Sequence, residues 1–171
     1  MEKKEDVFAI ARAFMRSRII LTGAQFDVFS QIEEGNSTAE KIAGKLNLDL
    51  RAITRVLDCL VTFGLLAKSG DTYSLTETGK PFSSKHPASA LPMVLHINHL
   101  WESWSGLTEV VKSGPESHRK LPKALDPDSR RAFIGAMHVV GRTLSEEIAA
   151  SLDLSGFRKL MDIGGGSGTY T

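Results

Sequence analysis

The chain has 171 residues and a single cysteine, Cys59. One cysteine excludes an intrachain disulfide and a zinc site built from cysteines. An excess of one charge sign is also missing, because 21 lysines and arginines stand against 20 acidic residues and leave a net charge of +1. A protein that binds nucleic acid mainly through attraction to phosphates is usually more basic, so this class is disfavoured.

Long apolar stretches are missing as well. The longest runs are far shorter than the roughly 20 residues that cross a bilayer. Residues 1–14 mix acids with lysines and lack the continuous apolar segment of a signal peptide. With 42% hydrophobic and 24% charged residues, the composition is that of an ordinary globular protein. We therefore expect a cytoplasmic protein with no membrane partner.

Glycine is plentiful and concentrated at one end, since four of the 15 glycines fall within the last eight residues. They follow residues 157–163, which are expected to form a short strand. Glycines after a strand let the backbone turn tightly and approach a ligand closely. The pattern is D-x-G-x-G-x-G, formed by Asp162, Gly164, Gly166 and Gly168, with Gly165 inside it.

The type of ligand follows from what surrounds these glycines. A Walker loop needs a lysine after its glycines, and none is present. The dinucleotide pattern GxGxxG/A fails at Thr169, where glycine or alanine is required. Asp162 would repel a pyrophosphate at close range and favours a ligand with positive charge, such as an ammonium or a sulfonium group.

The region before the glycines is predicted to be mostly helical. Apolar spacing indicates a helix over residues 5–18, a second that opens at Thr22, a short third that opens at Ser37, and a longer fourth capped by Asp49. Residues 65–75 change to a strand period and predict a β-hairpin. A short helix, a longer helix and a hairpin in this order are typical of a winged helix-turn-helix unit.

Two longer helical patterns come next. One covers residues 89–112. The other is opened by Asp126 as its N-cap and Pro127 at its first position, and it continues to about Ser151. Its bulky apolar residues form one stripe: Phe133, Met137, Val140, Leu144 and Ile148.

The string MDIGGGSG resembles the first motif of S-adenosylmethionine-dependent methyltransferases. It is most similar to the VDVGGGTG-like stretch of the small-molecule O-methyltransferases typified by the caffeic acid and hydroxyindole enzymes. Phe133 and Met137 match the F-x-x-x-M pair that precedes the loop in that family, and the resemblance covers nearly the whole chain.

The resemblance implies a mainly α fold in three parts. Residues 1–85 would form a winged-helix-like N-terminal dimerisation domain that joins two copies as a homodimer. Residues 86–152 would be a helical connecting region that contributes to the acceptor pocket. Residues 153–171 would be the first strand and glycine loop of a truncated, Rossmann-like S-adenosylmethionine-binding domain.

The same resemblance implies roles for single residues. Asp162 and the loop glycines Gly164, Gly165, Gly166 and Gly168 would bind the S-adenosylmethionine cofactor. Phe133 and Met137 would line the pocket of a small, aromatic, hydroxyl-bearing acceptor, although their spacing on an apolar stripe, taken alone, favours plain core packing. The catalytic base is expected beyond Thr171, so the parent protein would be the enzyme and the 171-residue chain itself inactive.

Two alternatives start from other residues. In a winged-helix DNA-binding regulator, Arg51, Arg55 and Lys68 would meet the duplex, but Asp49 and Asp58 offset the arginines, so a nucleic-acid partner is disfavoured.

In a metal site, His96, His99 and Glu102 would share one helix face. No HExxH motif or cysteine partner accompanies them, so we expect no metal.

Overall fold

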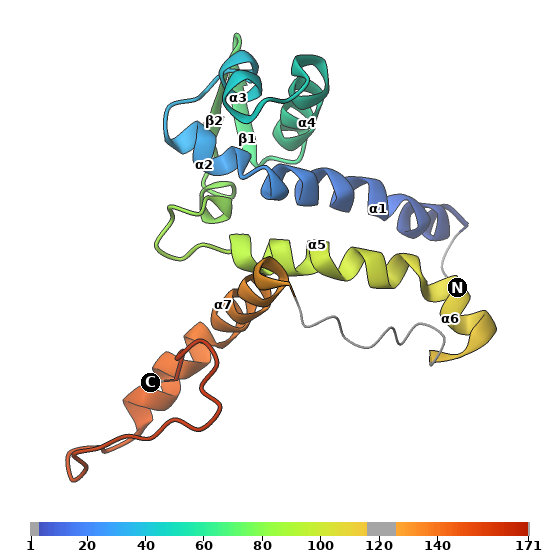
Figure 1. Ribbon diagram of the computed structural model, residues 1–171. Helices are drawn as coiled ribbons and strands as arrows, with labels where there is room; N and C mark the ends of the chain where they lie inside the picture. Colours follow the sequence, from blue (N-terminus) through green and yellow to red (C-terminus); the bar gives the residue numbers. More distant parts are fainter. Residues whose placement is uncertain (1–3, 116–125, 171) are drawn as a thin grey trace. The chain divides into compact units, whose positions relative to one another are not determined.

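The computed structural model describes residues 4–115 and 126–170 and divides into two compact units, Met1–Leu91 and Pro92–Thr171 (Figure 1). The described residues are mainly α-helical and hold one two-stranded sheet, as the sequence predicts.

The first unit contains four helices and a hairpin in the predicted order. The elements are α1 (Lys4–Gln25), α2 (Val28–Glu33), α3 (Ala39–Leu46), α4 (Leu50–Thr62), β1 (Leu66–Ser69), β2 (Thr72–Leu75) and the short 3₁₀ helix η1 (Lys80–Phe82). The strands pair antiparallel with Leu66 opposite Leu75. Gly70 turns the hairpin with a φ of 57°, a conformation that glycine adopts without strain.

The core of this unit forms because each helix turns one apolar stripe inward. Helix α4 buries Ile53, Leu57 and Leu60, which recur every three or four residues. The hairpin adds Leu66 and Tyr73, and both side chains are almost fully buried. The remaining buried members come from α2, α3 and the residue just before β1: Val28, Phe29, Ile32, Ala39, Ile42, Ala43 and Leu65.

The helix starts differ in part from those predicted. The Asp49 cap is confirmed, because its Oδ1 accepts the Ala52 N–H at 2.7 Å. The cap predicted at Ser37 lies one residue later, where the Thr38 hydroxyl accepts the Lys41 N–H at 3.3 Å. The helix start predicted at Thr22 is wrong, since α1 continues through Gln25.

The break between α1 and α2 occurs at Asp27, which has a left-handed backbone (φ 48°, ψ 43°). Its carboxylate accepts hydrogen bonds from the hydroxyls of Ser30 and Ser84, at 2.6 and 2.8 Å. Aspartate tolerates this backbone region better than most residues because its short side chain bonds locally. The same bonds fasten the segment after η1 to α2.

The second unit contains α5 (Leu91–Ser105), α6 (Leu107–Ser113) and α7 (Pro127–Ser151). The single helix predicted over residues 89–112 is wrong, because it divides at Gly106, where glycine's low helix propensity permits a break. The start of α7 is confirmed: Asp126 Oδ1 accepts the backbone N–H groups of Asp128 and Ser129, at 3.1 and 3.0 Å.

Helix α5 lies against the first part of α7. A Cβ added at Gly135 would stand 2.6 Å from Pro92 Cβ, so only glycine permits this approach. The His96 ring meets the Phe133 ring edge-on at 5.3 Å, and His99 Nδ1 lies 3.0 Å from Ser129 Oγ.

The strand predicted over residues 157–163 is not formed in the described chain. The segment has no regular secondary structure and is exposed, and Ile163 keeps 88% of its surface accessible. A strand needs a neighbour that takes its backbone N–H and C=O groups. The described residues place no second strand beside this one, so an apolar sequence alone does not make it a strand.

Replacing Leu57 with alanine tests the core of the first unit. Leu57 is fully buried, so Leu57→Ala is expected to lower the free energy of unfolding by roughly 2–5 kcal/mol. Leu50→Ala in the same helix is the matched control, because Leu50 is 43% exposed, and it should change stability far less. Urea titration followed by circular dichroism measures both, and equal losses would contradict the proposed core.

Candidate functional site

The glycine loop after α7 has an alternating backbone. Gly164, Gly166 and Gly168 all have positive φ values, of 77°, 57° and 69°. Residues with a side chain rarely adopt this region, so every second position requires glycine. A turn closes the loop where the Gly168 N–H donates to the Gly165 carbonyl at 2.8 Å. The result is a stretch of bare backbone.

Asp162 begins this loop, and its carboxylate lies against Gly165. A Cβ at Gly165 would collide with the Asp162 carboxylate, so the acid rests directly on the backbone of Gly165. Glycine is therefore required at position 165 for space, whereas Gly164, Gly166 and Gly168 are required for their backbone angles. The loop thus combines one carboxylate with backbone that side chains do not cover.

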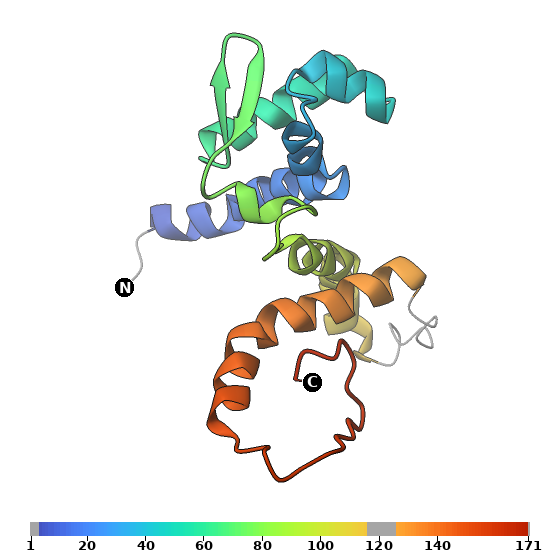
Figure 2. The same ribbon diagram turned by 90° about the vertical axis from the view of Figure 1, so that its left-hand side faces the viewer.

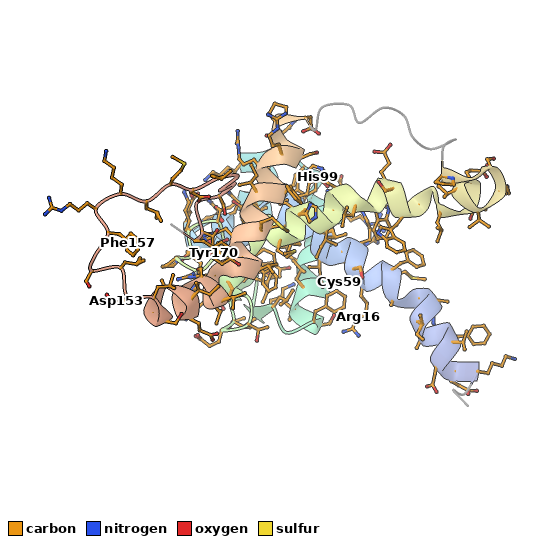
Figure 3. All side chains as sticks on the ribbon, turned by 90° about the horizontal axis from the view of Figure 1, so that it is seen from below. Arg16, Cys59, His99, Asp153, Phe157 and Tyr170 are labelled. Atoms are coloured by element: carbon orange, nitrogen blue, oxygen red, sulfur yellow. The ribbon has the colours of Figure 1, made fainter. Side chains whose placement is uncertain are left out.

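The end of the loop returns to α7. Figure 2 shows the segment after α7 curving back toward that helix. Thr169 Oγ1 lies 2.9 Å from His138 Nδ1. Tyr170, which Figure 3 labels, also lies close to α7, since a Cβ at Gly141 would stand 3.2 Å from its hydroxyl oxygen. His138 was missed from the sequence, because nothing in the local pattern signals a contact across 31 residues.

The predicted acceptor residues lie on the same helix. Phe133 and Met137 are 40% and 42% exposed on the apolar stripe of α7, and the remaining members Val140, Leu144 and Ile148 are exposed as well. Phe133 packs against His96 as described above. Helix α7 therefore carries the candidate acceptor residues and, at His138 and Gly141, the contacts to the end of the glycine loop.

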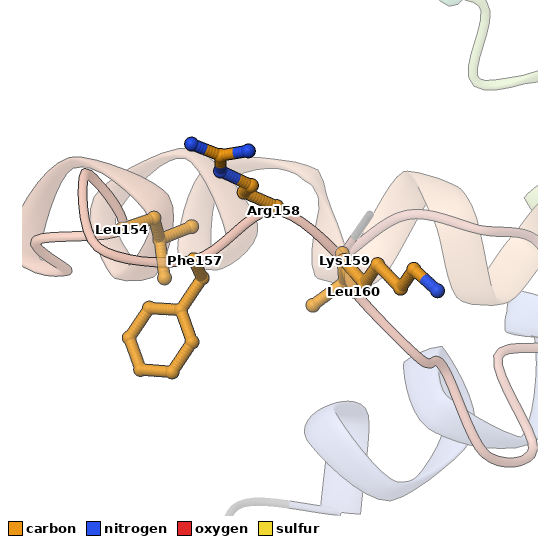
Figure 4. Close-up of a pocket in the computed structure, with 5 residues that line it drawn as sticks. All are labelled: Leu154, Phe157, Arg158, Lys159 and Leu160. Atoms are coloured by element: carbon orange, nitrogen blue, oxygen red, sulfur yellow. The ribbon is translucent and has the colours of Figure 1, made fainter.

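A hollow of about 400 Å³ lies in the segment between α7 and the glycines (Figure 4). Its lining consists of Leu154, Phe157, Arg158, Lys159 and Leu160. All five come from one short stretch of the chain, which turns where the Phe157 N–H donates to the Leu154 carbonyl at 3.0 Å. A ligand site usually combines polar groups that converge from several elements. We therefore take the glycine loop, and not this hollow, as the candidate ligand site.

The surface that would contact DNA is partly neutralised. Arg51 and Arg55 are exposed on α4, but Lys68 Nζ on the hairpin lies 2.7 Å from Asp58 Oδ1. The buried Tyr73 donates its hydroxyl to the same oxygen at 2.8 Å. The hydrogen bonds from Lys68 and then Tyr73 hold the pKa of the Asp58 carboxyl below its ordinary value. The lysine expected on the wing thus serves an internal ion pair.

The residues of the alternative metal site have separate partners. His99 is bonded to Ser129 and His96 packs on Phe133. Over residues 4–115 and 126–170, no group of three potential ligand side chains is close enough to hold an ion.

None of the helices in these ranges combines the length and hydropathy that crossing a bilayer requires.

The chain also matches known proteins. Residues 8–85 match the family model of the O-methyltransferase dimerisation domain. The match covers less than half of the chain and lies within its first unit, so it is a similarity of this part of the chain to that domain. The matched residues comprise most of α1 and all elements through η1.

Relatives extend the similarity beyond this domain. The O-methyltransferase SfmM3 of Streptomyces lavendulae is 29% identical over 170 residues, which covers 92% of this chain and 50% of the relative. The chain thus spans about half the length of curated relatives that it matches.

Two solved structures share the fold. Human N-acetylserotonin methyltransferase in complex with SAM has a TM-score of 0.76 at 21% identity, covering 99% of this chain and 55% of that one. An O-methyltransferase family protein from Burkholderia thailandensis has a TM-score of 0.74 at 22% identity, covering 99% and 52%.

Asp58→Asn is expected to give a pH-dependent loss of stability. Because folding lowers the pKa of Asp58, its carboxylate stabilises the fold above the ordinary aspartate pKa of about 4, and this contribution disappears as the pH falls through the lower folded-state pKa. The variant should lose up to about 1 kcal/mol at pH 7 and nothing near pH 2.

Thermal unfolding between pH 2 and 7 measures this difference. The control is Asp71→Asn at the exposed hairpin turn, which should not show the same pH dependence. A loss for Asp58→Asn that is equal at every pH would argue against the ion pair.

Proposed function

We propose that these residues belong to an S-adenosylmethionine-dependent methyltransferase that transfers a methyl group to a hydroxyl of a small aromatic acceptor. One observation supports the proposal most: a loop of alternating left-handed glycines with an acid against Gly165 follows a segment that matches the O-methyltransferase dimerisation domain. The two solved methyltransferase structures named above support it, since their similarity covers 99% of this chain and therefore includes the loop region.

The loop residues fit the chemistry of such a cofactor. S-adenosylmethionine, when bound, supplies a methyl group on a positively charged sulfonium centre. Asp162 offers the opposite charge, which a cationic ligand favours. The backbone of Gly164 would contact the cofactor, Gly165 leaves room for the acid, and Gly166 and Gly168 keep the turn free of side chains.

The acceptor would lie against the first half of α7. Phe133 and Met137 are four residues apart on one helix face and partly exposed, so together they offer an apolar wall to a flat ring. We assign no catalytic base among the described residues. In this function the chain contributes binding and orientation, which lower the barrier of a bimolecular transfer.

We propose the division into three parts that the sequence predicts: residues 1–85 form a winged-helix-like dimerisation domain, 86–152 the connecting region and 153–171 the start of the cofactor domain. We also propose that the protein is cytoplasmic and forms a homodimer. Exposed apolar side chains on α1 support the dimer: Val7, Phe8, Ile10, Phe14 and Met15 are each at least half exposed. Such a stripe gains free energy when a partner covers it.

A charge on this stripe should separate the dimer. Phe14→Glu is expected to convert a dimer, seen by light scattering at tens of micromolar, into a monomer, because an unpaired carboxylate would be buried at the interface. Ala9→Glu is the control, since helical spacing puts Ala9 opposite the stripe. A wild-type monomer at this concentration, or equal effects of both variants, would contradict the assignment.

Calorimetry tests the cofactor site. The 171-residue chain is expected to bind S-adenosylmethionine more weakly than micromolar, and a longer protein that continues through the remaining cofactor-domain strands should bind it at micromolar levels. In that longer protein, Asp162→Asn should weaken binding roughly tenfold to a hundredfold, as expected for the loss of a charged partner.

Asp153→Asn is the matched control, because this acid precedes the loop and accepts the N–H of Ser155 at 3.0 Å. It should leave the affinity unchanged. Equal affinities of wild type and Asp162→Asn would remove Asp162 from the cofactor site. Absence of methyl transfer to any hydroxylated aromatic compound by the longer protein would reject the function itself.

A further inference from the structure

Three side chains at the junction of α5 and α7 form a hydrogen-bonded chain. Ser129 Oγ donates to Asp126 Oδ2 at 2.5 Å and lies 3.0 Å from His99 Nδ1. The Ser129 hydroxyl and backbone hold the pKa of Asp126 below its ordinary value, so this carboxylate is ionised at neutral pH and acts only as an acceptor.

The hydrogen bonds among Asp126, Ser129 and His99 determine which ring nitrogen of His99 holds the proton. A serine hydroxyl has one proton, and Ser129 gives it to Asp126. The hydroxyl oxygen must then accept from His99, so the proton of the neutral imidazole is on Nδ1. Nε2 therefore has a free lone pair. Among residues 4–115 and 126–170, Ser129 is the only hydrogen-bond partner of His99, and the His99 side chain is exposed.

The opposite arrangement occurs at His86, which provides an internal reference. There the backbone N–H of Ala88 donates to His86 Nδ1 at 3.1 Å, so Nδ1 is the acceptor and the proton of the neutral ring is on Nε2. The two histidines are thus held in opposite tautomers by their neighbours.

His99 lies beside the candidate acceptor wall. His96, three residues earlier on α5, meets Phe133 edge-on at 5.3 Å, while Ser129 is one turn before Phe133 on α7. The same pair of helices therefore presents an aromatic ring, a second imidazole and the unprotonated Nε2 of His99. An aromatic molecule that lies on Phe133 and has a hydroxyl group would find a hydrogen-bond acceptor in Nε2 of His99.

We propose that His99 is a specificity-determining residue that accepts a hydrogen bond from a hydroxyl group of the aromatic acceptor through Nε2, with Ser129 and Asp126 setting its tautomer. This inference rests on the proposed function for the identity of the ligand as a methyl acceptor. It assigns His99 to recognition and not to proton removal. Through this hydrogen bond, His99 favours aromatic molecules that have a hydroxyl group over ring analogues that have none.

The tautomer is tested in the 171-residue chain by long-range proton–nitrogen correlation spectra. His99 should show protonated Nδ1 and bare Nε2, and His86 the reverse. Ser129→Ala should return His99 to the Nε2-protonated form, whereas Ser105→Ala, which removes a hydroxyl bonded to the Trp101 carbonyl, should not. Nε2 protonation of wild-type His99 would overturn the proposal.

Recognition is tested with 2-naphthol and 2-methoxynaphthalene, which share a ring system but differ in the hydroxyl proton. 2-Naphthol should shift the Nε2 resonance of His99, and the ether should not. An identical response to both compounds, or no response to either, would overturn the assignment.

Two variants separate recognition from structure. In His99→Asn the amide can still donate to Ser129 but nothing replaces Nε2, so the preference for 2-naphthol should be lost while the fold is kept. His99→Gln places a carboxamide near Nε2 and should restore part of the preference. Preference retained in His99→Asn would reject the role of Nε2. If the longer protein transfers no methyl group while these results hold, the proposed function fails and the hydroxyl site remains.

Discussion

Each backbone N–H and C=O that leaves water must find a hydrogen-bond partner, and this requirement determines which segments of the chain have regular structure. Helices satisfy it within themselves, which is why they dominate both units. Strands β1 and β2 satisfy it by pairing with each other across a tight turn. Residues 157–163 also have an apolar sequence but no neighbouring strand in the described chain, and they stay irregular and exposed.

The sequence predicts best what is decided locally. Asp49 and Asp126 are identified as caps because an aspartate just before a helical apolar pattern can accept the free N–H groups of the first turn. In the structure, Asp49 accepts the Ala52 N–H and Asp126 accepts the Ser129 N–H. The hairpin is identified from its change of period. The break at Gly106 is missed because apolar spacing continues across it, and a single glycine lowers helix propensity by only about 1 kcal/mol.

Contacts between distant residues lie outside such reasoning. The glycine loop could be located from the sequence because its spacing is unusual, and its positive φ values follow the same spacing. That His138 would meet Thr169, or that His99 would meet Ser129, depends on how α7 packs against the tail and against α5. No periodicity encodes those distances. The spacing of His96 and His99 on α5 shows that they share a helix face, but it does not show that their partners are Phe133 and Ser129 on α7.

Gly135 has a consequence for changing the acceptor range of such a protein by directed evolution. Its missing side chain sets how closely α5 approaches α7, since even a methyl group there would meet Pro92. A library that varies Phe133 and Met137 changes only the proposed acceptor wall and leaves this spacing intact. A library that includes position 135 would move the two helices apart and disturb many side chains at once. Mutational tolerance on this helix should therefore change sharply between neighbouring positions, with Gly135 at the intolerant end.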